Sequence, residues 1–200
     1  MYIPAHFRET DLDRIAELIE RNAFGMLVTA PDGSPFVSHL PFIFERSAAD
    51  NGKLFCHMAR ANPQWQHCSS GGNVLAVFQG PHAYVSPSWY ASEGVPTWNY
   101  AVVHLRGKAR LIESEPELWA LVERLTHIYE DNRSSPWRPD PAADGHRKML
   151  KAIVGLEIQV TDIEAKFKLS QNRSLQDRQN VIQALAQSVK QMEVDLANLM

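Results

Sequence analysis

Residues 53–65 read KLFCHMARANPQW, and this stretch decides the predicted fold. The turn sequence DNG at 50–52 precedes it, and residues 53–58 have strand character. Asn62 is a favoured helix N-cap. Pro63 suits the first helical position, because a backbone N–H there would have no partner within the helix and its absence in proline costs no hydrogen bond. We therefore predict a strand over 53–58 that leads into a short helix ending near Cys68.

Short strands flank this stretch on both sides. Turn sequences such as PDGS at 31–34 separate apolar runs rich in β-branched and aromatic residues. Residues 24–30 and 36–44 are predicted to form a hairpin, and further strands are predicted at 74–78, 100–112 and 153–160. Helices are predicted at 11–22 with the Thr10 hydroxyl as cap, at 116–129 and near Met149, with a loop over 134–145. Successive strands with helices only at edges and crossings indicate a mainly β (α+β) fold, a small closed barrel with peripheral helices.

The last 27 residues differ in pattern from the rest of the chain. Apolar residues recur there at spacings of 3, 4, 3, 4 and 3 on a long amphipathic helix starting near Ser174. Two interpretations stay open: the stripe packs on the same chain, or it pairs with the same helix of a second copy. The residues of the stripe are Ile182, Leu185, Val189, Met192, Leu196 and Leu199.

Composition excludes several classes of protein. The 200 residues suit one domain, or one domain and a tail. A net charge of −3 disfavours avid, sequence-independent DNA binding, which needs many phosphate contacts. Cys56 and Cys68 form no disulfide framework, and no apolar run has the length of a membrane span or signal core, so we expect a cytoplasmic protein with no membrane partner.

Residues 61–105 contain many aromatic rings and Glu93 as their only formally charged residue. Such a stretch favours burial in a core, in a subunit interface or against a flat ligand. The segments 84–90 and 95–100 mix rings with hydrogen-bonding groups, which is typical of a pocket for a planar heteroaromatic. An aromatic dimer interface without a ligand stays open as the alternative.

A phosphate site is predicted where the central strand meets its helix. Helix starts present free backbone N–H groups to an anion, and Arg60 adds a fork of donors beside them. The alternative is an exposed arginine without a ligand. Neither a Rossmann glycine motif nor a Walker loop is present, and neither a metal spacing among the eight histidines nor a hydrolase motif is found.

Residues 166–173, KFKLSQNR, form a compact basic and amide-rich element ahead of the last helix. One interpretation is a solvated loop that leads to a cap at Ser174. The other is a cationic lid, since a cation near the pyrimidine ring of a flavin stabilises the negative charge of its reduced form.

Six motifs, in order over nearly the whole chain, resemble the PaiB family of FMN-binding negative transcriptional regulators. They are MYIP with Phe7, the FG at 24–25 leading to SHLPF at 38–42, the stretch 53–65, YVSPSWY at 84–90, VPTWNY at 95–100, and residues 166–173. The resemblance implies a split β-barrel related to flavin reductases and pyridoxamine-phosphate oxidases. It further implies a homodimer with FMN at the subunit interface, an FMN-binding domain over 1–173 and a C-terminal helix over 174–200 that packs on the barrel or on the partner subunit.

The resemblance also implies a set of cofactor-binding residues. Wider-family members place Arg and Lys on the second strand and an Arg-Lys pair after the third; here Ser38, His39, Asn62 and Pro63 stand there, which leaves Arg60 as the main local cation. The residues expected to bind FMN are Ser38, His39, His57, Met58, Ala59, Arg60, Asn62, Trp98, Asn99 and Lys168.

Three functions compete. The resemblance favours a flavin-binding repressor, although no helix-turn-helix with a basic recognition helix is found. The second is an FMN-dependent oxidoreductase or flavin reductase that holds a small planar substrate near Trp89, Trp98 and Asn99. The third is a haem-binding barrel with His39, His57 or His104 as axial ligand.

Overall fold

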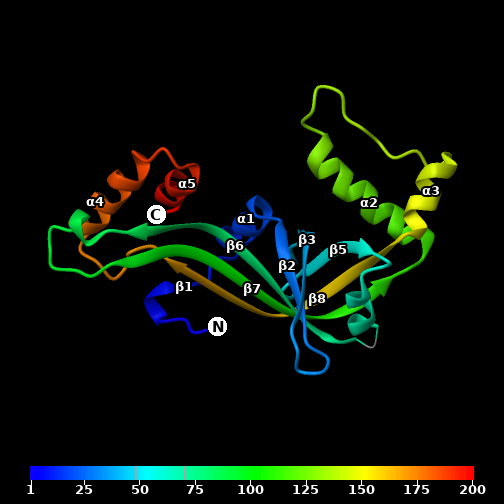
Figure 1. The fold of residues 1–200 in the computed structure, drawn as a ribbon, viewed down its shortest axis with the longest axis horizontal. Helices are drawn as coiled ribbons and strands as arrows, with labels where there is room; N and C mark the ends of the chain where they lie inside the picture. The colour runs from blue at the N-terminus through cyan, green and yellow to red at the C-terminus, as the bar shows by residue number, and fades with distance from the viewer. Residues whose placement is uncertain (48, 70) are drawn as a thin grey trace. The chain divides into compact units, whose positions relative to one another are not determined.

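The computed structural model describes residues 1–47, 49–69 and 71–200. Its strands follow the sheet order β3-β2-β6-β7-β8-β5-β4, and β1 pairs with β8 (Figure 1). The strands are β1 (Arg8–Glu9), β2 (Phe24–Thr29), β3 (Phe36–Pro41), β4 (Ile43–Glu45), β5 (Lys53–Ala59), β6 (Asn73–Val85), β7 (Thr97–Ile112) and β8 (Ile153–Lys168). The helices are α1 (Leu12–Arg21), α2 (Glu115–Glu130), α3 (Asp144–Lys151), α4 (Leu175–Ala186) and α5 (Gln191–Leu199), with 3-10 turns η1 (Ala5–Phe7), η2 (Pro63–Cys68) and η3 (Pro87–Trp89).

The chain forms two compact units. The first unit comprises residues 1–22, 78–104 and 164–200, and the second comprises residues 23–77 and 105–163. The long strands β6, β7 and β8 contribute residues to both units. Residues 174–200 lie in the first unit, and a domain boundary at residue 173 stays a prediction.

The second unit contains the predicted hairpin and the central strand. β2 and β3 are antiparallel, with Phe24 opposite Pro41 and Thr29 opposite Phe36, and Gly33 in the connecting turn has a φ of 79°. The predicted strand 36–44 is broken after Pro41, whose ring nitrogen has no hydrogen to donate to a ladder. The chain then changes partner, and β4 pairs with β5 instead.

Helices α2 and α3 lie beside one another in the second unit (Figure 1). Their apolar residues pack with Ile43 and Ile112 of the sheet in one buried cluster, whose other members are Leu118, Leu121, Leu125 and Leu150. Gly155 of β8 permits the close approach, because a Cβ there would lie 3.0 Å from Ile112 Cβ and 3.0 Å from Leu121 Cδ2. The helices predicted at 116–129 and near Met149 are thereby confirmed.

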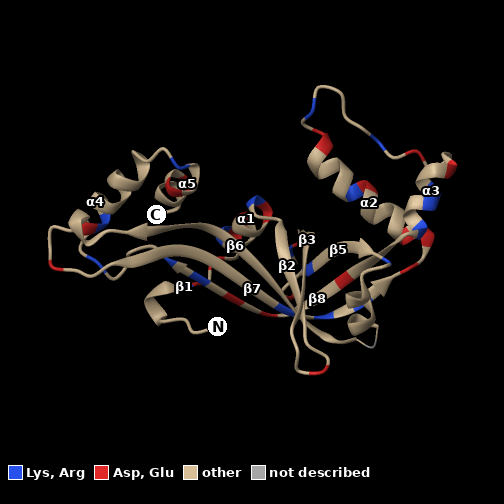
Figure 2. Ribbon diagram, viewed as in Figure 1, with Lys and Arg blue, Asp and Glu red and all other residues tan. Residues whose placement is uncertain are grey.

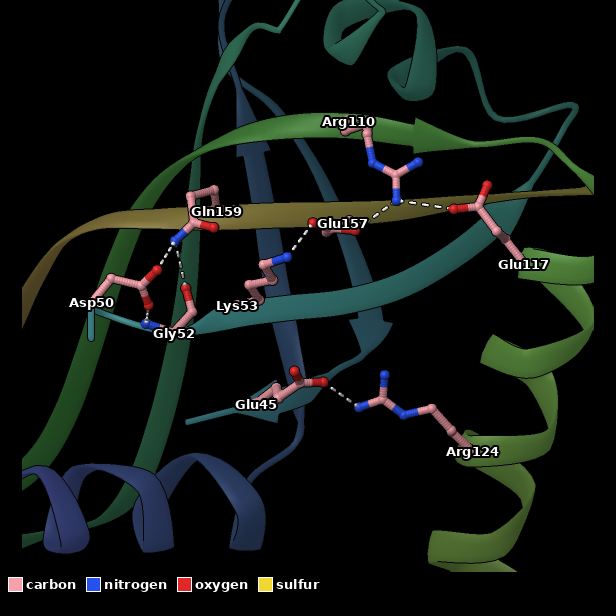
Figure 3. A network of polar contacts seen from close by, with 9 residues as sticks. All are labelled: Glu45, Asp50, Gly52, Lys53, Arg110, Glu117, Arg124, Glu157 and Gln159. Atoms are coloured by element: carbon pink, nitrogen blue, oxygen red, sulfur yellow. Dashed lines mark hydrogen bonds and ion pairs between the residues drawn. The ribbon is translucent and has the colours of Figure 1, made fainter. Parts of the chain in front are cut away.

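Ion pairs join α2 to the same sheet (Figure 3). Glu157 of β8 lies between two cations, 2.8 Å from Lys53 Nζ and 2.6 Å from Arg110 Nη2. Arg110 also pairs with Glu117 of α2 at 3.2 Å. Because most of these side chains are well exposed to solvent, each pair adds little stability, and the apolar cluster is the main attachment of α2.

The first unit contains α1 and the two C-terminal helices. Asp11 caps α1 by accepting from the backbone N–H groups of Asp13 and Arg14, so the cap expected at Thr10 is displaced by one residue. A carboxylate in this position also favours the positive end of the helix dipole. The buried face of α1 includes Leu18, whose Cδ1 would lie 2.9 Å from a Cβ at Gly80 of β6.

The single long C-terminal helix that the sequence suggests is in fact two helices. α4 ends at Ala186 and α5 begins at Gln191. The Ser188 hydroxyl accepts a hydrogen bond from the N–H of Lys190 at 3.1 Å, a local turn that competes with the helical backbone pattern. Val189 is fully exposed at this break while Leu185 and Leu196 are fully buried, so the apolar stripe is divided between two helices that contact each other. The stripe therefore gives no support to a coiled-coil dimer.

Cations and anions alternate along the helices rather than gathering on one of them (Figure 2). Arg178 and Lys190, for example, stand near Asp177, Glu193 and Asp195 in sequence. In the part of the chain that the structure describes, no helix combines the length and apolar character needed to span a membrane.

Candidate functional site

The turn from β5 into η2 has the geometry that the sequence predicts. The Asn62 side chain accepts the N–H of Gln64 at 3.0 Å and so caps η2. Its amide nitrogen donates to Ser38 Oγ of β3 at 2.8 Å. Two predicted cofactor residues that are 24 positions apart are thus held together, and they present a hydroxyl and an amide beside a helix start.

Gln64 fixes this turn and was not among the predicted residues. Its side chain is fully buried, and Nε2 donates to the Leu27 carbonyl at 2.9 Å, to Thr29 Oγ1 at 3.2 Å and to the Phe36 carbonyl at 3.1 Å. One amide therefore joins η2 to both strands of the β2–β3 hairpin. A glutamine five residues after the end of β5 and next to a proline gives no sequence signal for such a role.

His57 of β5 carries a polar atom without a partner. Its Nδ1 is buried and forms no hydrogen bond among the described residues. Burial lowers the pKa of His57, so the imidazole is neutral near pH 7 and can accept or donate one further hydrogen bond. An unpaired buried nitrogen costs stability unless a ligand or a partner chain satisfies it.

The neighbours of His57 and Ser38 are placed differently. Met58 is 3% exposed and its side chain lies in the core, so only its backbone is available to a ligand. Ala59 is exposed at the end of β5, and His39 is exposed on β3 with its ring stacked 6.1 Å from that of Phe24. Of this group, Ala59 and His39 are open to solvent.

Arg60 is already engaged by protein acceptors. Its Nε and Nη2 donate to the carbonyls of Lys151 and Ile153, each at 3.3 Å, and its Nη1 pairs with Glu113 at 3.1 Å. Its guanidinium also lies 6.0 Å from the Trp65 ring centroid. Because the Glu113 pair is solvent-exposed and therefore weak, a phosphate could displace it at small cost.

The remaining predicted residues, Trp98, Asn99 and Lys168, lie in the first unit. Asn99 is 1% exposed and donates to Ser170 Oγ at 2.9 Å, so its amide serves the packing of this unit. Lys168 Nζ donates to Thr97 Oγ1 and to the Trp98 carbonyl, both at 2.5 Å. The Trp98 ring is 54% exposed. The structure thus divides the predicted set into one group around Ser38 and Asn62 and another around Lys168.

The basic element 166–173 is not a loop throughout. β8 continues to Lys168, well beyond the predicted end at 160, and Lys166 is only 8% exposed. Ser170 follows with a φ of 62°, which turns the chain toward α4. The strand was missed because charged residues such as Asp162 and Glu164 interrupt its apolar pattern.

Neither the group around Ser38 and Asn62 nor the group around Lys168 contains a cluster of metal-ligating side chains among the described residues. Among the described residues there is no cluster of three or more His, Cys, Asp or Glu side chains that could hold a metal ion. Cys56 and Cys68 are buried free thiols, and burial raises the pKa of both, to about 11 for Cys68, so each stays protonated at neutral pH.

Asp177 of α4 anchors the connection between β6 and β7. Its Oδ1 accepts the N–H groups of Ala91 at 2.7 Å and Ser92 at 3.2 Å, and its Oδ2 accepts the Ser92 hydroxyl at 2.5 Å. The Ser92 hydroxyl, with these two N–H groups, holds the pKa of Asp177 below its ordinary value. The aromatic segment 84–90 is therefore tied to the first turn of α4.

This carboxylate should make stability depend on pH. A depressed pKa in the folded state contributes stability that is present above the unfolded pKa of about 3.9 and is lost as pH falls through the folded value. We expect Asp177→Asn to lower the urea midpoint at pH 7 and to flatten its fall between pH 7 and acid pH. Asp32→Asn, in the exposed hairpin turn, is the control. Parallel pH curves for wild type and Asp177→Asn would contradict this role.

Comparison with models of protein families assigns the chain to a family. Residues 1–162 match the model of the family described as "Putative FMN-binding domain". The chain belongs to this FMN-binding domain family. The match covers the second unit up to residue 162 and residues 1–22 and 78–104 of the first, including every predicted cofactor residue except Lys168. The predicted cofactor, FMN, is the one for which the family is named.

One curated relative extends the resemblance to the full length. The chain is 41% identical over 204 residues to the Bacillus subtilis protein "Protease synthase and sporulation protein PAI 2", covering 100% of this chain and 96% of the relative. A second relative, an uncharacterised protein of Emericella nidulans, is 33% identical over 91% of this chain and 89% of its own length. The predicted membership of the PaiB family is confirmed.

Solved structures share the fold at low sequence identity. A FAD- and haem-binding protein from Mycobacterium smegmatis aligns with a TM-score of 0.63 at 18% identity, over 80% of this chain and 73% of its own. A flavocytochrome from Azotobacter vinelandii aligns with a TM-score of 0.63 at 15% identity, over 83% and 72%. The predicted mainly β split barrel with peripheral helices is confirmed.

Proposed function

We propose that this chain is a cytoplasmic, homodimeric FMN-binding regulatory protein that lowers expression of target genes. The observation that carries the proposal is the family match over residues 1–162 together with the full-length similarity to a protein named for protease synthesis and sporulation. Flavin, when bound, supplies a redox-active ring system that can report the state of the cell.

The group around Ser38 and Asn62 fits the polar part of the cofactor. The Ser38 hydroxyl and the Asn62 amide lie beside the start of η2, where they can meet phosphate or ribityl oxygens. The buried Nδ1 of His57 lacks a protein partner among the described residues, and a hydrogen-bonding ligand could supply one. Arg60 adds a positive charge once its exposed pair with Glu113 opens.

Exposed aromatic rings support the dimer. Phe24 is 70% exposed and Trp98 54% exposed, within a chain whose residues 61–105 carry a single formal charge. Surface aromatic residues of this kind are enriched at protein interfaces. We expect twice the chain mass in solution at micromolar concentration, and a monomer there would contradict the dimer.

Flavin titration tests the cofactor part of the proposal. FMN is expected to bind the flavin-free chain about tenfold or more tightly than riboflavin, because charge-assisted hydrogen bonds reach only the phosphate. Ser38→Ala and Asn62→Ala should weaken FMN binding about tenfold, since each removes a polar partner. Ser34→Ala, in the exposed hairpin turn, is the control and should leave affinity unchanged. Equal affinity for FMN and riboflavin would contradict the assignment.

A mobility assay with the gene's own upstream DNA tests the regulatory part. Sequence-selective retardation over a range of salt concentrations is the expected result, and retardation that is equal on unrelated DNA would contradict direct repression. Rapid reduction of the bound flavin by NADH or NADPH, with catalytic turnover, would instead support the second function, an FMN-dependent oxidoreductase.

A further inference from the structure

A cavity of about 560 Å³ is lined by α2, by the end of the loop that follows it and by α3 (Figure 1). This volume is within the usual range for small-molecule sites. The described lining contains none of the residues expected to bind FMN, and all of it belongs to the second unit. A ligand in this cavity would therefore be separate from the flavin. The lining includes Glu115, Pro116, Trp119, Glu123, Pro141 and Arg147.

One face of α2 supplies an indole ring between two carboxylates. Glu115, Trp119 and Glu123 are four residues apart, so they follow one another along the same side of the helix. Trp119 packs against the buried cluster beneath α2 and α3 but is only half-buried, which leaves part of the residue to line the cavity. This wall of the cavity is therefore apolar at its centre and acidic at its ends.

The carboxylate of Glu123 stands out among those of α2. Glu117 pairs with Arg110 at 3.2 Å, and Glu130 pairs with Arg133 at 3.0 Å. Glu123 is half-buried, yet among the described residues it forms neither an ion pair nor a side-chain hydrogen bond. Because partial burial of an unpaired charge is unfavourable, this position favours a cationic group of a ligand.

The opposite wall is held in place by contacts to the backbone of the loop. Arg147 Nε donates to the Pro141 carbonyl at 2.9 Å, and His146 Nδ1 accepts the N–H of Asp140 at 2.9 Å. The His146 ring also meets the Trp137 ring at 5.5 Å between centroids. Among the described residues, Nη1 and Nη2 of Arg147 have no partner. A guanidinium fixed through Nε thus presents a pre-oriented pair of donors, which suits a carboxylate.

Opposite charges line this cavity without pairing. In the part of the chain that the structure describes, no ion pair joins Arg147 to Glu115 or Glu123. A cation on one wall and an anion on the other are complementary to a molecule that carries both charges. A ligand with a single charge would satisfy one wall and leave the charge of the other wall without a partner.

We propose that this cavity binds a small zwitterion of the amino-acid class, with its carboxylate on Arg147, its ammonium on Glu123 and an apolar side chain on Trp119. Charge-assisted hydrogen bonds at both ends would fix the orientation of the ligand. The proline rings of Pro116 and Pro141 border the indole and extend the apolar surface. The site therefore favours an amino acid with a sizeable apolar side chain over glycine.

Calorimetry with L-leucine and two analogues tests the proposal on the flavin-free chain. The analogues are isoamylamine, which lacks the carboxylate, and 4-methylpentanoate, which lacks the ammonium. Leucine should bind, and each analogue should bind at least tenfold more weakly, because each leaves one charged wall of the cavity unpaired. Glycine keeps both charges but has no side chain to place on Trp119, so it should also bind at least tenfold more weakly.

Two substitutions assign the two charges separately. Arg147→Met should weaken leucine binding about tenfold without weakening the binding of isoamylamine, which has no carboxylate for Arg147 to hold. Glu123→Gln should weaken leucine binding about tenfold without weakening the binding of 4-methylpentanoate. Lys148→Met is the matched control, because Lys148 is as exposed as Arg147 on α3 and is not among the residues that line the cavity.

Three results would overturn the inference. The first is leucine binding no tighter than about 1 mM, and the second is an analogue that binds as tightly as leucine. The third is a loss of FMN affinity in Arg147→Met, because the cavity would then belong to the flavin site. Leucine is titrated without flavin, so a failure to bind it is distinct from a failure to bind FMN.

Discussion

Replacing Gln64 with leucine is expected to lower the free energy of unfolding by about 3 kcal/mol, because it removes the donors of a fully buried amide and leaves acceptors unpaired. The acceptors are Thr29 Oγ1 and the Leu27 carbonyl in β2 and the Phe36 carbonyl in β3. Urea unfolding at neutral pH measures the loss directly.

A matched control separates this effect from a general intolerance of η2 to leucine. Gln66 lies two residues further along the same 3-10 turn with its side chain exposed. Gln66→Leu should change the free energy of unfolding by less than about 0.5 kcal/mol. Equal midpoints for the two variants would show that the buried amide does not hold the hairpin. A folded Gln64→Leu protein should also bind FMN more weakly, because the Asn62–Ser38 contact loses its support.

The second large effect is expected at Gly107, where β7 lies close beside its neighbour in the sheet, β8. An added Cβ would lie 2.5 Å from the Gln159 carbonyl oxygen and 2.6 Å from Ile158 Cγ2. The nearer of these atoms is backbone and cannot move without disturbing the strand. We expect Gly107→Ala to cost about 3 kcal/mol of unfolding free energy.

Gly145 supplies the control for this substitution. It lies in α3 with nothing within 4 Å of an added Cβ, so alanine there should stabilise the protein by up to about 1 kcal/mol through helix propensity. The two substitutions are therefore expected to have opposite signs in the same urea experiment. A Gly107→Ala midpoint at or above that of wild type would contradict the close approach of β7 and β8.

The sequence predicts the local elements well where the apolar pattern agrees with the cap and turn residues that flank it. The Asn62 cap with Pro63 behind it specifies η2, and the turn at Gly33 specifies the β2–β3 hairpin. The chain departs from prediction where tertiary contacts override the local signal. β8 continues to Lys168 because rings cover Lys166 and make a charged residue compatible with a buried strand. The C-terminal stripe is divided because a serine turn near Val189 breaks the helix.

The candidate site was predictable in part. Family resemblance selects Ser38 and Asn62, and the structure adds that one hydrogen bond joins them. The role of Gln64 depends on acceptors 28 to 37 residues away, which no local pattern indicates. The protein partners of Arg60 and Asn99 were also beyond local rules, because the Ile153 carbonyl and the Ser170 hydroxyl that they bind lie 93 and 71 residues away in the sequence.

We expect FMN to lie with a phosphate or ribityl oxygen on Ser38 and Asn62 and with a hydrogen bond to the buried ring nitrogen of His57. A crystal structure of the chain grown with FMN tests this most directly. Cofactor oxygens within hydrogen-bond distance of Ser38 Oγ or Asn62 Nδ2 are the expected result. A well-ordered flavin that contacts none of these three side chains would contradict it.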